Sequence, residues 1–564
     1  MNSEYIIQAA VQSQDNSMST VKDLQNLSKQ PSTQKSHTMK KILKSDEAQK
    51  LHPEYLRLRN SFWTKAYNIG AATASYASEP FCKLSHTFTM LKMGIPRAVQ
   101  KLMLPSRLAR SLLFRTKADP SSGTLTVCDN RTQRRYEIPI DRNSIKALEL
   151  QKIISVQVDA NSVSYSGLKI LDPGYLNTAC VESNITFIDG GHGSIHYRGY
   201  SIEYLFENHD YEEIVFLLIW GHLPDAVEKK TFQRKIAAGC IPPPHVIQVI
   251  ESFPRDSLTS TMVFAGMAAY ASHDEGAITT LQSGRPAFMG QADKVDEALI
   301  GCISALATVV ALVYCRKRNK TFTPADPEDS FIANILRMMG FHEDSHSGKP
   351  DQEIVKCFEK LWILYADHEM TNSTAAFLHA ASTLTDPLAC CISGLVSGYG
   401  PLHGGAIELA YKAFEDLGTP ENVPMLIADV KAKKQRLFGY GHRIYKAVDP
   451  RAKFIRAMIY QYKDRVESNP LLSIAMEVDR VANTEKYFTS RNLKANADLY
   501  GCFLYTAFGF ETDIIVAMAC LSRIPGVLAH WREAMLEKGP MLWRPQQVFT
   551  GPPPREGNPS NLQC

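Results

Sequence analysis

The stretch SGYGPLHGGAIELAYK, residues 397–412, places one histidine, His403, among four glycines and a proline, directly before an apolar, helix-like run. Glycine lets the backbone approach a ligand closely and adopts positive φ without cost. The N-terminus of a helix adds a positive dipole end and free N–H groups, which suit anionic ligands and lower the pKa of an imidazole. We therefore expect His403 to be a neutral hydrogen-bond donor to a carbonyl that gains negative charge.

Two further histidines lie in comparable surroundings. His442 follows two glycines in FGYGHRIYK, residues 438–446, and we expect a helix after it as well. His368 lies in YADHEMTNST, at the end of an apolar helix. Each of these histidines alone is more often a turn residue than a catalytic one. GYGHRIYK matches no nucleotide-binding motif, and the run Asp367-His368-Glu369 is not a zinc-binding HExxH, so no metal site is predicted.

Arginine is the residue best suited to bind carboxylates through two hydrogen bonds. Arg451 stands nine residues after His442, Arg523 follows an apolar helix, and Arg544 lies in WRPQQ. Together with the histidines they would suit a substrate with two carboxylates and a carbonyl, although most arginines form surface ion pairs. Asp498, in NADLYG, is a candidate base, and its alternative role is that of a helix N-cap.

Composition restricts the class of protein. The chain has 564 residues, of which 45% are hydrophobic and 21% charged, and its net charge is only +4. Such a balance is typical of globular proteins and gives no support to nucleic-acid binding, for which no motif is present either. The 12 cysteines are scattered without a CxxC pair, which predicts reduced thiols in an intracellular protein.

Two segments raise questions of membrane and compartment. Residues 298–315 are uncharged and precede RKRNK, which fits a buried core helix better than a membrane span. Residues 80–118 contain eight Lys or Arg and no Asp or Glu. This segment resembles a mitochondrial presequence, which translation from Met90 would expose, and the alternatives are a basic tail or surface helix and a cytoplasmic protein.

Together these segments resemble the citrate synthase family, in the bacterial-type branch that also occurs in fungi. The match runs from about Thr124 to Thr550, and the motifs stand in the order that the family has. Any one of them is weak, whereas their joint order and spacing is specific. They are TLTVCDN, YEIPI, LDPGYLNTA, YRGYSIEYL, LYADHEMTNSTAA, GYGPLHGGA, FGYGHRIYKAVDPRA, NADLYG, LAHWREA and WRPQQVFTG.

The resemblance implies a mainly α, two-domain fold with a small N-terminal β element. In this division, residues 1–120 form a poorly ordered or targeting-like extension and residues 551–564 a C-terminal tail. Alternation of apolar and polar residues around a DN turn predicts a hairpin within 124–140, and short strands are expected within 184–196. The implied segments between are a β-containing element at 121–200, a large domain at 201–405, a small domain at 406–515, and a return to the large domain at 516–550.

The resemblance also implies roles for single residues. His403 would polarise the thioester carbonyl of an acyl-CoA, Asp498 would take the proton from the neighbouring carbon, and His442 would hydrogen-bond the ketone of oxaloacetate. Other implied oxaloacetate ligands are His368, Arg451, Arg523 and, across the interface of a homodimer with shared sites, Arg544. Implied CoA ligands are Lys446, Gly439, Tyr440 and Gly441. No cofactor is expected beyond the acyl-CoA substrate.

Departures from the family pattern concern the surroundings of these residues. Tyr365 stands where the family usually has a histidine, Leu378 lies near the position of a missing arginine, and Gln546 replaces a common basic residue. They favour a divergent relative that joins oxaloacetate to a longer acyl-CoA and makes an alkylcitrate. The alternatives are citrate or 2-methylcitrate formation from acetyl- or propionyl-CoA, a non-catalytic member of the fold, and a membrane-anchored protein.

Overall fold

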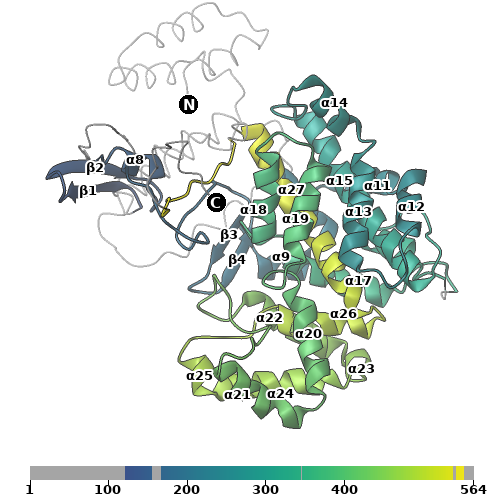
Figure 1. Cartoon of the computed structure of the whole chain (residues 1–564). Coiled ribbons are helices and arrows are strands. Elements are labelled where there is room, and N and C mark those ends of the chain that lie inside the picture. The colour runs from purple at the N-terminus through teal and green to yellow at the C-terminus, as the bar shows by residue number, and fades with distance from the viewer. Residues whose placement is uncertain (1–120, 155–166, 344–345, 538–541, 552–564) are drawn as a thin grey trace, which may run out of the picture. The chain divides into compact units, whose positions relative to one another are not determined.

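A computed structural model describes residues 121–154, 167–343, 346–537 and 542–551. These ranges are mainly helical and hold two small antiparallel sheets (Figure 1), which confirms the predicted fold class. Residue contacts divide the chain into a unit at 1–173 and a unit at 174–564. The presequence-like segment with Met90, the rest of the proposed extension at 1–120 and the tail from 552 lie outside the described residues.

The first unit contains the predicted hairpin. Strand β1 (Gly123–Asp129) pairs antiparallel with β2 (Arg134–Ile140), from Gly123 opposite Ile140 to Asp129 opposite Arg134. The carboxylate of Asp129 accepts hydrogen bonds from the backbone N–H and the guanidinium of Arg131, which fixes the turn between the strands. Helix α8 (Ala147–Gln151) follows.

The second unit begins with the other sheet, in the order β3 (Thr186–Asp189), β4 (Ser194–Tyr197) and β5 (Tyr200–Ser201). The side chain of Asp189 accepts hydrogen bonds from the N–H groups of Gly191 and His192 and closes the predicted glycine turn. Tyr197 is fully buried and donates from its hydroxyl to the backbone oxygens of Ile363 and Asp367, at 3.2 and 3.0 Å. The sheet is thereby joined to the segment that carries His368.

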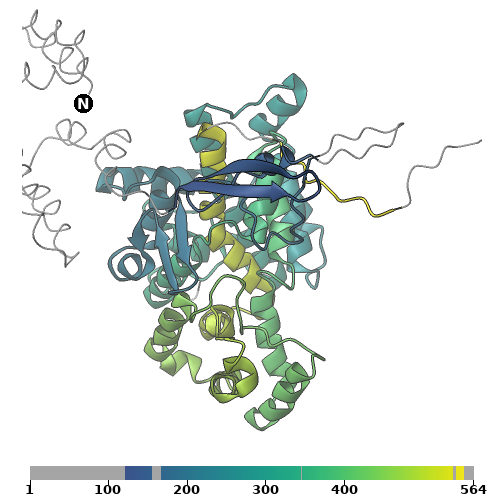
Figure 2. The ribbon, with the colours of Figure 1, turned by 90° about the vertical axis from the view of Figure 1, so that its left-hand side faces the viewer.

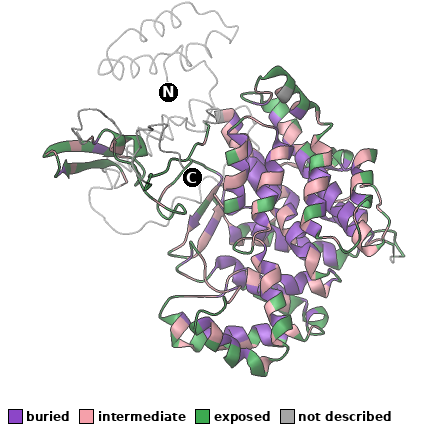
Figure 3. Ribbon diagram, in the orientation of Figure 1, coloured by how far each residue is buried: buried purple, intermediate pink, exposed green. Residues whose placement is uncertain are grey.

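Helix α15 (Ala292–Arg318) forms a first group with ten other helices. In order they are α9 (Ile202–Asn208), α10 (Tyr211–Trp220), α11 (Ala226–Gly239), α12 (Pro244–Glu251), α13 (Thr259–Ala271), α14 (Glu275–Ser283), α16 (Phe331–Met338), α17 (Gln352–Tyr365), α18 (Asn372–Ala381) and α19 (Pro387–Gly398). Helix α15 contacts α11, α12, α13, α16 and α19. The C-terminal helix α27 (Ile515–Glu537) returns to this group and contacts α10, α15, α17 and α18. Figure 3 shows the buried residues concentrated along these helices.

A second group of helices follows α19. It contains α20 (Ala406–Leu417), α21 (Val423–Lys431), α22 (Pro450–Gln461), α23 (Lys463–Val466), α24 (Leu471–Thr484), α25 (Lys486–Thr489) and α26 (Asp498–Ala507). Figures 1 and 2 show α20 to α25 gathered at the lower end of the unit. The division into domains at 201–405 and 406–515 stays a prediction, since both ranges lie within one contact unit.

The uncharged segment 298–315 lies within α15, and every residue from Cys302 to Cys315 is buried. By length and composition, α15 and the stretch Thr512–Leu536 could each cross a membrane, but 83% of the apolar window of each is covered by the protein itself. Such coverage is that of core helices in a large helical domain.

Candidate active site

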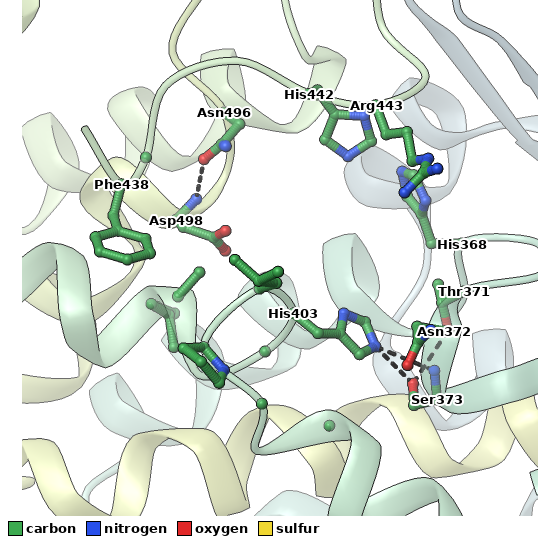
Figure 4. Close-up of a pocket in the computed structure, with 18 of the residues that line it drawn as sticks. His368, Thr371, Asn372, Ser373, His403, Phe438, His442, Arg443, Asn496 and Asp498 are labelled. Atoms are coloured by element: carbon green, nitrogen blue, oxygen red, sulfur yellow. Dashed lines mark hydrogen bonds between the residues drawn. The ribbon is translucent and has the colours of Figure 1, made fainter. Parts of the chain in front are cut away.

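One cavity of about 1550 Å³ brings together predicted residues from five parts of the second unit. They come from the turn after α17, the turn between α19 and α20, the loop before α22 with the start of that helix, the start of α26, and α27, and residues of other helices, among them α18 and α19, complete the lining. Figure 4 shows His368, His403, His442 and Asp498 around the same open space. The predicted residues that line this cavity are His368, His403, Gly439, Tyr440, Gly441, His442, Arg451, Asp498 and Arg523.

His403 lies three residues before α20, as the sequence predicts. The glycines after it serve the turn itself, however, and not the approach of a ligand. A Cβ on Gly404 would stand 2.6 Å from the carbonyl oxygen of Gly398, and one on Gly405 would stand 2.6 Å from that of Tyr399. These residues must be glycine because the chain folds back on the end of α19.

The imidazole of His403 has a defined hydrogen-bond direction. Its Nε2 accepts from the backbone N–H of Ser373 at 3.3 Å, and the Ser373 hydroxyl oxygen lies 2.8 Å from the same nitrogen. Burial, with a smaller contribution from Arg523, lowers the pKa of His403 to about 4. The ring is therefore neutral at pH 7, and because Nε2 accepts, its proton resides on Nδ1.

His442 lies in an irregular loop, and the helix expected directly after it is absent. Helix α22 begins only at Pro450, because Asp449 caps it by accepting from the N–H of Arg451. The loop is held instead by a hydrogen bond from the N–H of Gly441 to the carbonyl oxygen of Lys494, with Gly441 at φ +82°. A helix dipole therefore does not explain the pKa of His442, which burial and then Arg451 lower to about 4.

The backbone N–H groups of Ile444 and Tyr445 donate to Nδ1 of His442, at 3.1 and 3.4 Å. Since Nδ1 accepts, the neutral ring carries its proton on Nε2. The His442 ring lies 5.3 Å from that of His368, centre to centre. Nε2 of His368 in turn hydrogen-bonds the hydroxyl of Tyr445 at 2.8 Å. Burial lowers the pKa of His368 well below its usual value, and Arg451 and Arg523 add to this.

Two of the arginines that line the cavity, Arg451 and Arg523, are each anchored through part of the guanidinium group. Asp449 binds Nε and Nη2 of Arg451, at 3.0 and 2.8 Å, and leaves Nη1 for another acceptor. Nε of Arg523 donates to the carbonyl oxygen of Tyr365, which leaves both terminal nitrogens for a ligand. Although burial opposes it, Asp449 raises the pKa of Arg451 well above its usual value, so that this buried cation is permanent.

Asp498 is the first residue of α26, and its side chain does not cap the helix. Its backbone N–H donates to the side chain of Asn496 at 2.9 Å, and the Asn496 amide nitrogen donates to the carbonyl oxygen of Gly441 at 2.9 Å. Burial raises the pKa of Asp498 to about 6, Arg451 opposes this, and Asp449 adds to it. A carboxylate in this range can accept a proton near neutral pH and release it again.

Two predicted residues lie elsewhere. The side chain of Lys446 is exposed, and its backbone N–H donates to the carbonyl oxygen of Gly190 at 2.8 Å. Arg544 is exposed as well, and neither belongs to the described residues that line the cavity. Four cations that the sequence analysis did not single out line it instead, namely Lys433, Lys434, Arg436 and Arg443. The run KAKKQR before FGYG was the available signal. Within the described ranges, no cluster of His, Cys, Asp and Glu could hold a metal.

Comparisons with known proteins agree with this geometry. Residues 174–546 match the family described as citrate synthase, C-terminal domain. The citrate synthase-like protein oryE of Aspergillus oryzae is 44% identical over 77% of this chain and 97% of its own length. The alkylcitrate synthase phiJ of a fungal species is 36% identical over 78% of this chain and 96% of its own length.

Solved structures give the same result. A ternary complex of citrate synthase from Thermoplasma acidophilum with carboxymethyl coenzyme A and oxaloacetate is similar with a TM-score of 0.62 and 29% identity. The similarity covers 69% of this chain and 98% of that one. The chain therefore belongs to the citrate synthase family, and it is an acyltransferase of the class that converts acyl groups into alkyl groups on transfer.

Proposed function

We propose that this enzyme condenses oxaloacetate with an acyl-CoA and then hydrolyses the thioester, which yields an alkylcitrate and free CoA. The observation that carries the proposal is a partly buried carboxylate with a pKa of about 6, Asp498, in one cavity with the neutral imidazole of His403, the buried Arg451 and the partly buried Arg523. Loss of the weakly acidic proton next to a thioester requires both a base and a donor to the carbonyl oxygen.

Oxaloacetate would bind between the two anchored arginines. The terminal nitrogens of Arg523 and the Nη1 of Arg451 point to carboxylate binding, since each guanidinium keeps donors that its anchor does not use. His368 would complete the binding site. The Nε2–H of His442 would donate to the ketone oxygen, because Nδ1 of this ring is already an acceptor.

The first chemical step moves one proton and one electron pair. The Asp498 carboxylate takes the proton from the carbon next to the thioester, and the C–H electron pair shifts into an enolate whose oxygen receives a hydrogen bond from Nδ1–H of His403. The enolate carbon then attacks the ketone carbon, and the ketone π electrons become an alkoxide that His442 protonates or stabilises. Water finally attacks the thioester carbonyl and expels CoA as the thiol.

The cations at the cavity suit the phosphates of CoA. Lys433, Lys434, Arg436 and Arg443 lie along the same loop as Gly439, Tyr440 and Gly441, and we propose that this loop holds the nucleotide end of the substrate. Lys446 would contribute only after a rearrangement of the loop. Arg544 would bind oxaloacetate in the partner subunit of a homodimer, and a dimer mixed from Arg544→Ala and Asp498→Asn chains should then regain part of the activity.

The preference for a longer acyl chain rests on the departures in sequence and on relatives such as the alkylcitrate synthases phiJ and tstJ, the latter 34% identical. The test is release of free thiol from acyl-CoAs of increasing length, acetyl to decanoyl, in the presence of oxaloacetate. Preference for a medium or long chain supports an alkylcitrate product. Preference for acetyl- or propionyl-CoA would assign citrate or 2-methylcitrate formation, and no release with any chain would favour a non-catalytic member.

A further inference from the structure

We propose that an unbranched alkyl chain of the acyl-CoA lies against an apolar wall of the cavity that α18, α19 and α27 form together. This inference rests on the proposed function and deepens it. The apolar wall consists of Phe377 on α18, Cys391 and Leu395 on α19, and Cys520, Ile524 and Val527 on α27, all of which line the cavity. None carries a charge, and the charged residues that line the cavity are Arg523, on the same helix as Cys520, and residues outside the wall such as those of the basic loop.

The spacing of these residues shows that whole helix faces form the wall. Cys520, Ile524 and Val527 follow each other at i, i+4 and i+7, and so do Cys391, Leu395 and Gly398 on α19. Residues at this spacing share one side of a helix. Ser373 and Phe377 lie one turn apart on α18. Three helix faces therefore converge on one part of the cavity.

The wall begins behind the ring of His403, at its Nε2 edge, whereas the thioester carbonyl would be held at Nδ1–H of the same ring. Ser373 contacts Nε2 of His403, and its carbonyl oxygen lies 3.4 Å from the point where a Cβ on Gly394 would stand. Phe377 lies 3.5 Å from that same point. An alkyl chain that extends past the His403 ring would therefore meet apolar side chains behind the His403–Ser373 pair. An acetyl group has no chain to place there.

Small side chains keep this part narrow and open. A Cβ on Gly398 would lie 3.1 Å from the sulfur of Cys520, so that glycine and thiol together allow α19 and α27 to approach. Cys520 keeps partial solvent contact between the fully buried Met518 and Leu521, whereas Leu395 and Val527 are each 4% exposed. We call the space beside Cys520 the slot, and we expect it to take methylene groups in single file more readily than an aromatic ring. Each buried methylene should raise kcat/KM roughly fourfold.

The experiment measures kcat/KM for acetyl-, butyryl-, hexanoyl-, octanoyl- and phenylacetyl-CoA with oxaloacetate, in parallel with their dissociation constants by calorimetry. Wild-type enzyme should prefer octanoyl over acetyl at least tenfold and should use phenylacetyl-CoA poorly. Cys520→Met, whose longer side chain fills the slot, should lower the octanoyl-to-acetyl ratio at least tenfold. Leu395→Ala should move the optimum to longer chains. Val396→Met, on the exposed side of α19, is the control and should keep the wild-type profile.

Each result decides between defined outcomes. The proposed wall is refuted if kcat/KM of the wild-type enzyme does not rise with each added methylene. It is also refuted if Cys520→Met lowers kcat/KM equally for all chain lengths at an unchanged melting temperature. If no substrate releases CoA, the proposed function fails, and the dissociation constants then test the wall alone. Tighter binding of octanoyl-CoA than of acetyl-CoA, with this difference lost in Cys520→Met, supports the wall. Equal binding of the two substrates to the wild-type enzyme refutes the wall. If Cys520→Met does not fold, Leu395→Ala and its opposite shift provide the same decision.

Discussion

The two sides of the cavity hold their polar groups by different means. On the side formed by α17, α18 and α27, a backbone group takes part in each anchor: the carbonyl oxygen of Tyr365 receives Nε of Arg523, and the N–H of Ser373 donates to His403 beside the Ser373 hydroxyl. On the side formed by the loop before α22 and by α26, backbone N–H groups hold His442, but side chains anchor the charged groups. The carboxylate of Asp449 binds Arg451 and also accepts from the N–H of Ala497, at 3.2 Å.

Further side-chain anchors occur on this second side. Asn496 joins the loop of His442 to the N–H of Asp498, and the buried Asp479 receives the hydroxyls of both Tyr440 and Tyr500. A segment with little regular structure needs such bonds, because its backbone groups lack helical partners. Since a point mutation can remove a side chain but not a carbonyl group, the second side should be the more sensitive to substitution.

The largest effect is expected at the base itself. Asp498→Asn should lower kcat on the order of 10³-fold, because the amide cannot accept the proton. The same substitution should raise the free energy of unfolding. Burial raises the folded-state pKa from 3.8 to about 6, so the ionised form weakens the fold once pH rises through this window, and the neutral amide should add at most ~3 kcal/mol at pH 8. Thiol release and urea unfolding measure the two effects, and near-normal turnover would refute the role of Asp498.

Removal of the side-chain anchor of Arg451 should come next. Asp449→Asn leaves a buried guanidinium without its counter-charge, and such a loss costs about 3–5 kcal/mol. Asp449 is 2% exposed and Arg451 7%, so water cannot replace the lost partner. The midpoint of urea unfolding should fall accordingly, and the KM for oxaloacetate should rise. If Asp449→Asn lowered the free energy of unfolding by less than about 1 kcal/mol, the second side of the cavity would tolerate substitution as well as the first.

The rate should also depend on pH through Asp498 alone. The base works when ionised, so kcat should fall about tenfold per pH unit below pH 6. His403 and His442 do not contribute to this change, because their pKa values of about 4 keep them neutral above about pH 5. Burial also lowers the pKa of His368 well below its usual value. The log of kcat against pH from 4.5 to 8.5 gives the result. If the plot showed two ionisations between pH 5 and neutral pH, a histidine would also have to lose a proton before the enzyme is active, which would contradict the prediction.

The sequence predicted the mainly helical fold, the hairpin within 124–140 and nine of the residues that line the cavity, because periodicity and glycine-flanked histidines are local signals. It missed Ser373, Asn496 and Asp449, whose partners lie up to 55 residues away along the chain. Hydrogen bonds of this kind leave no local pattern. The helix expected after His442 was wrong because glycines with positive φ and bonds to another segment decide that backbone.

The smallest effect is expected at Tyr365, where the two sides meet. Its hydroxyl donates to the carbonyl oxygen of Ala497 at 3.1 Å, next to the base, and its ring lies 5.8 Å from the guanidinium of Arg451. Tyr365→Phe keeps the ring and the backbone carbonyl that anchors Arg523, and it removes a single hydrogen bond, worth ~1 kcal/mol. The free energy of unfolding should fall by about this amount, and kcat should fall less than about tenfold. Tyr365→Ala is the harsher comparison, since it also removes the ring from Arg451 and should cost about 3–5 kcal/mol. If Tyr365→Phe lowered the free energy of unfolding as much as Asp449→Asn, the contact between the two sides at Tyr365 would matter as much as the side-chain anchors of the second side.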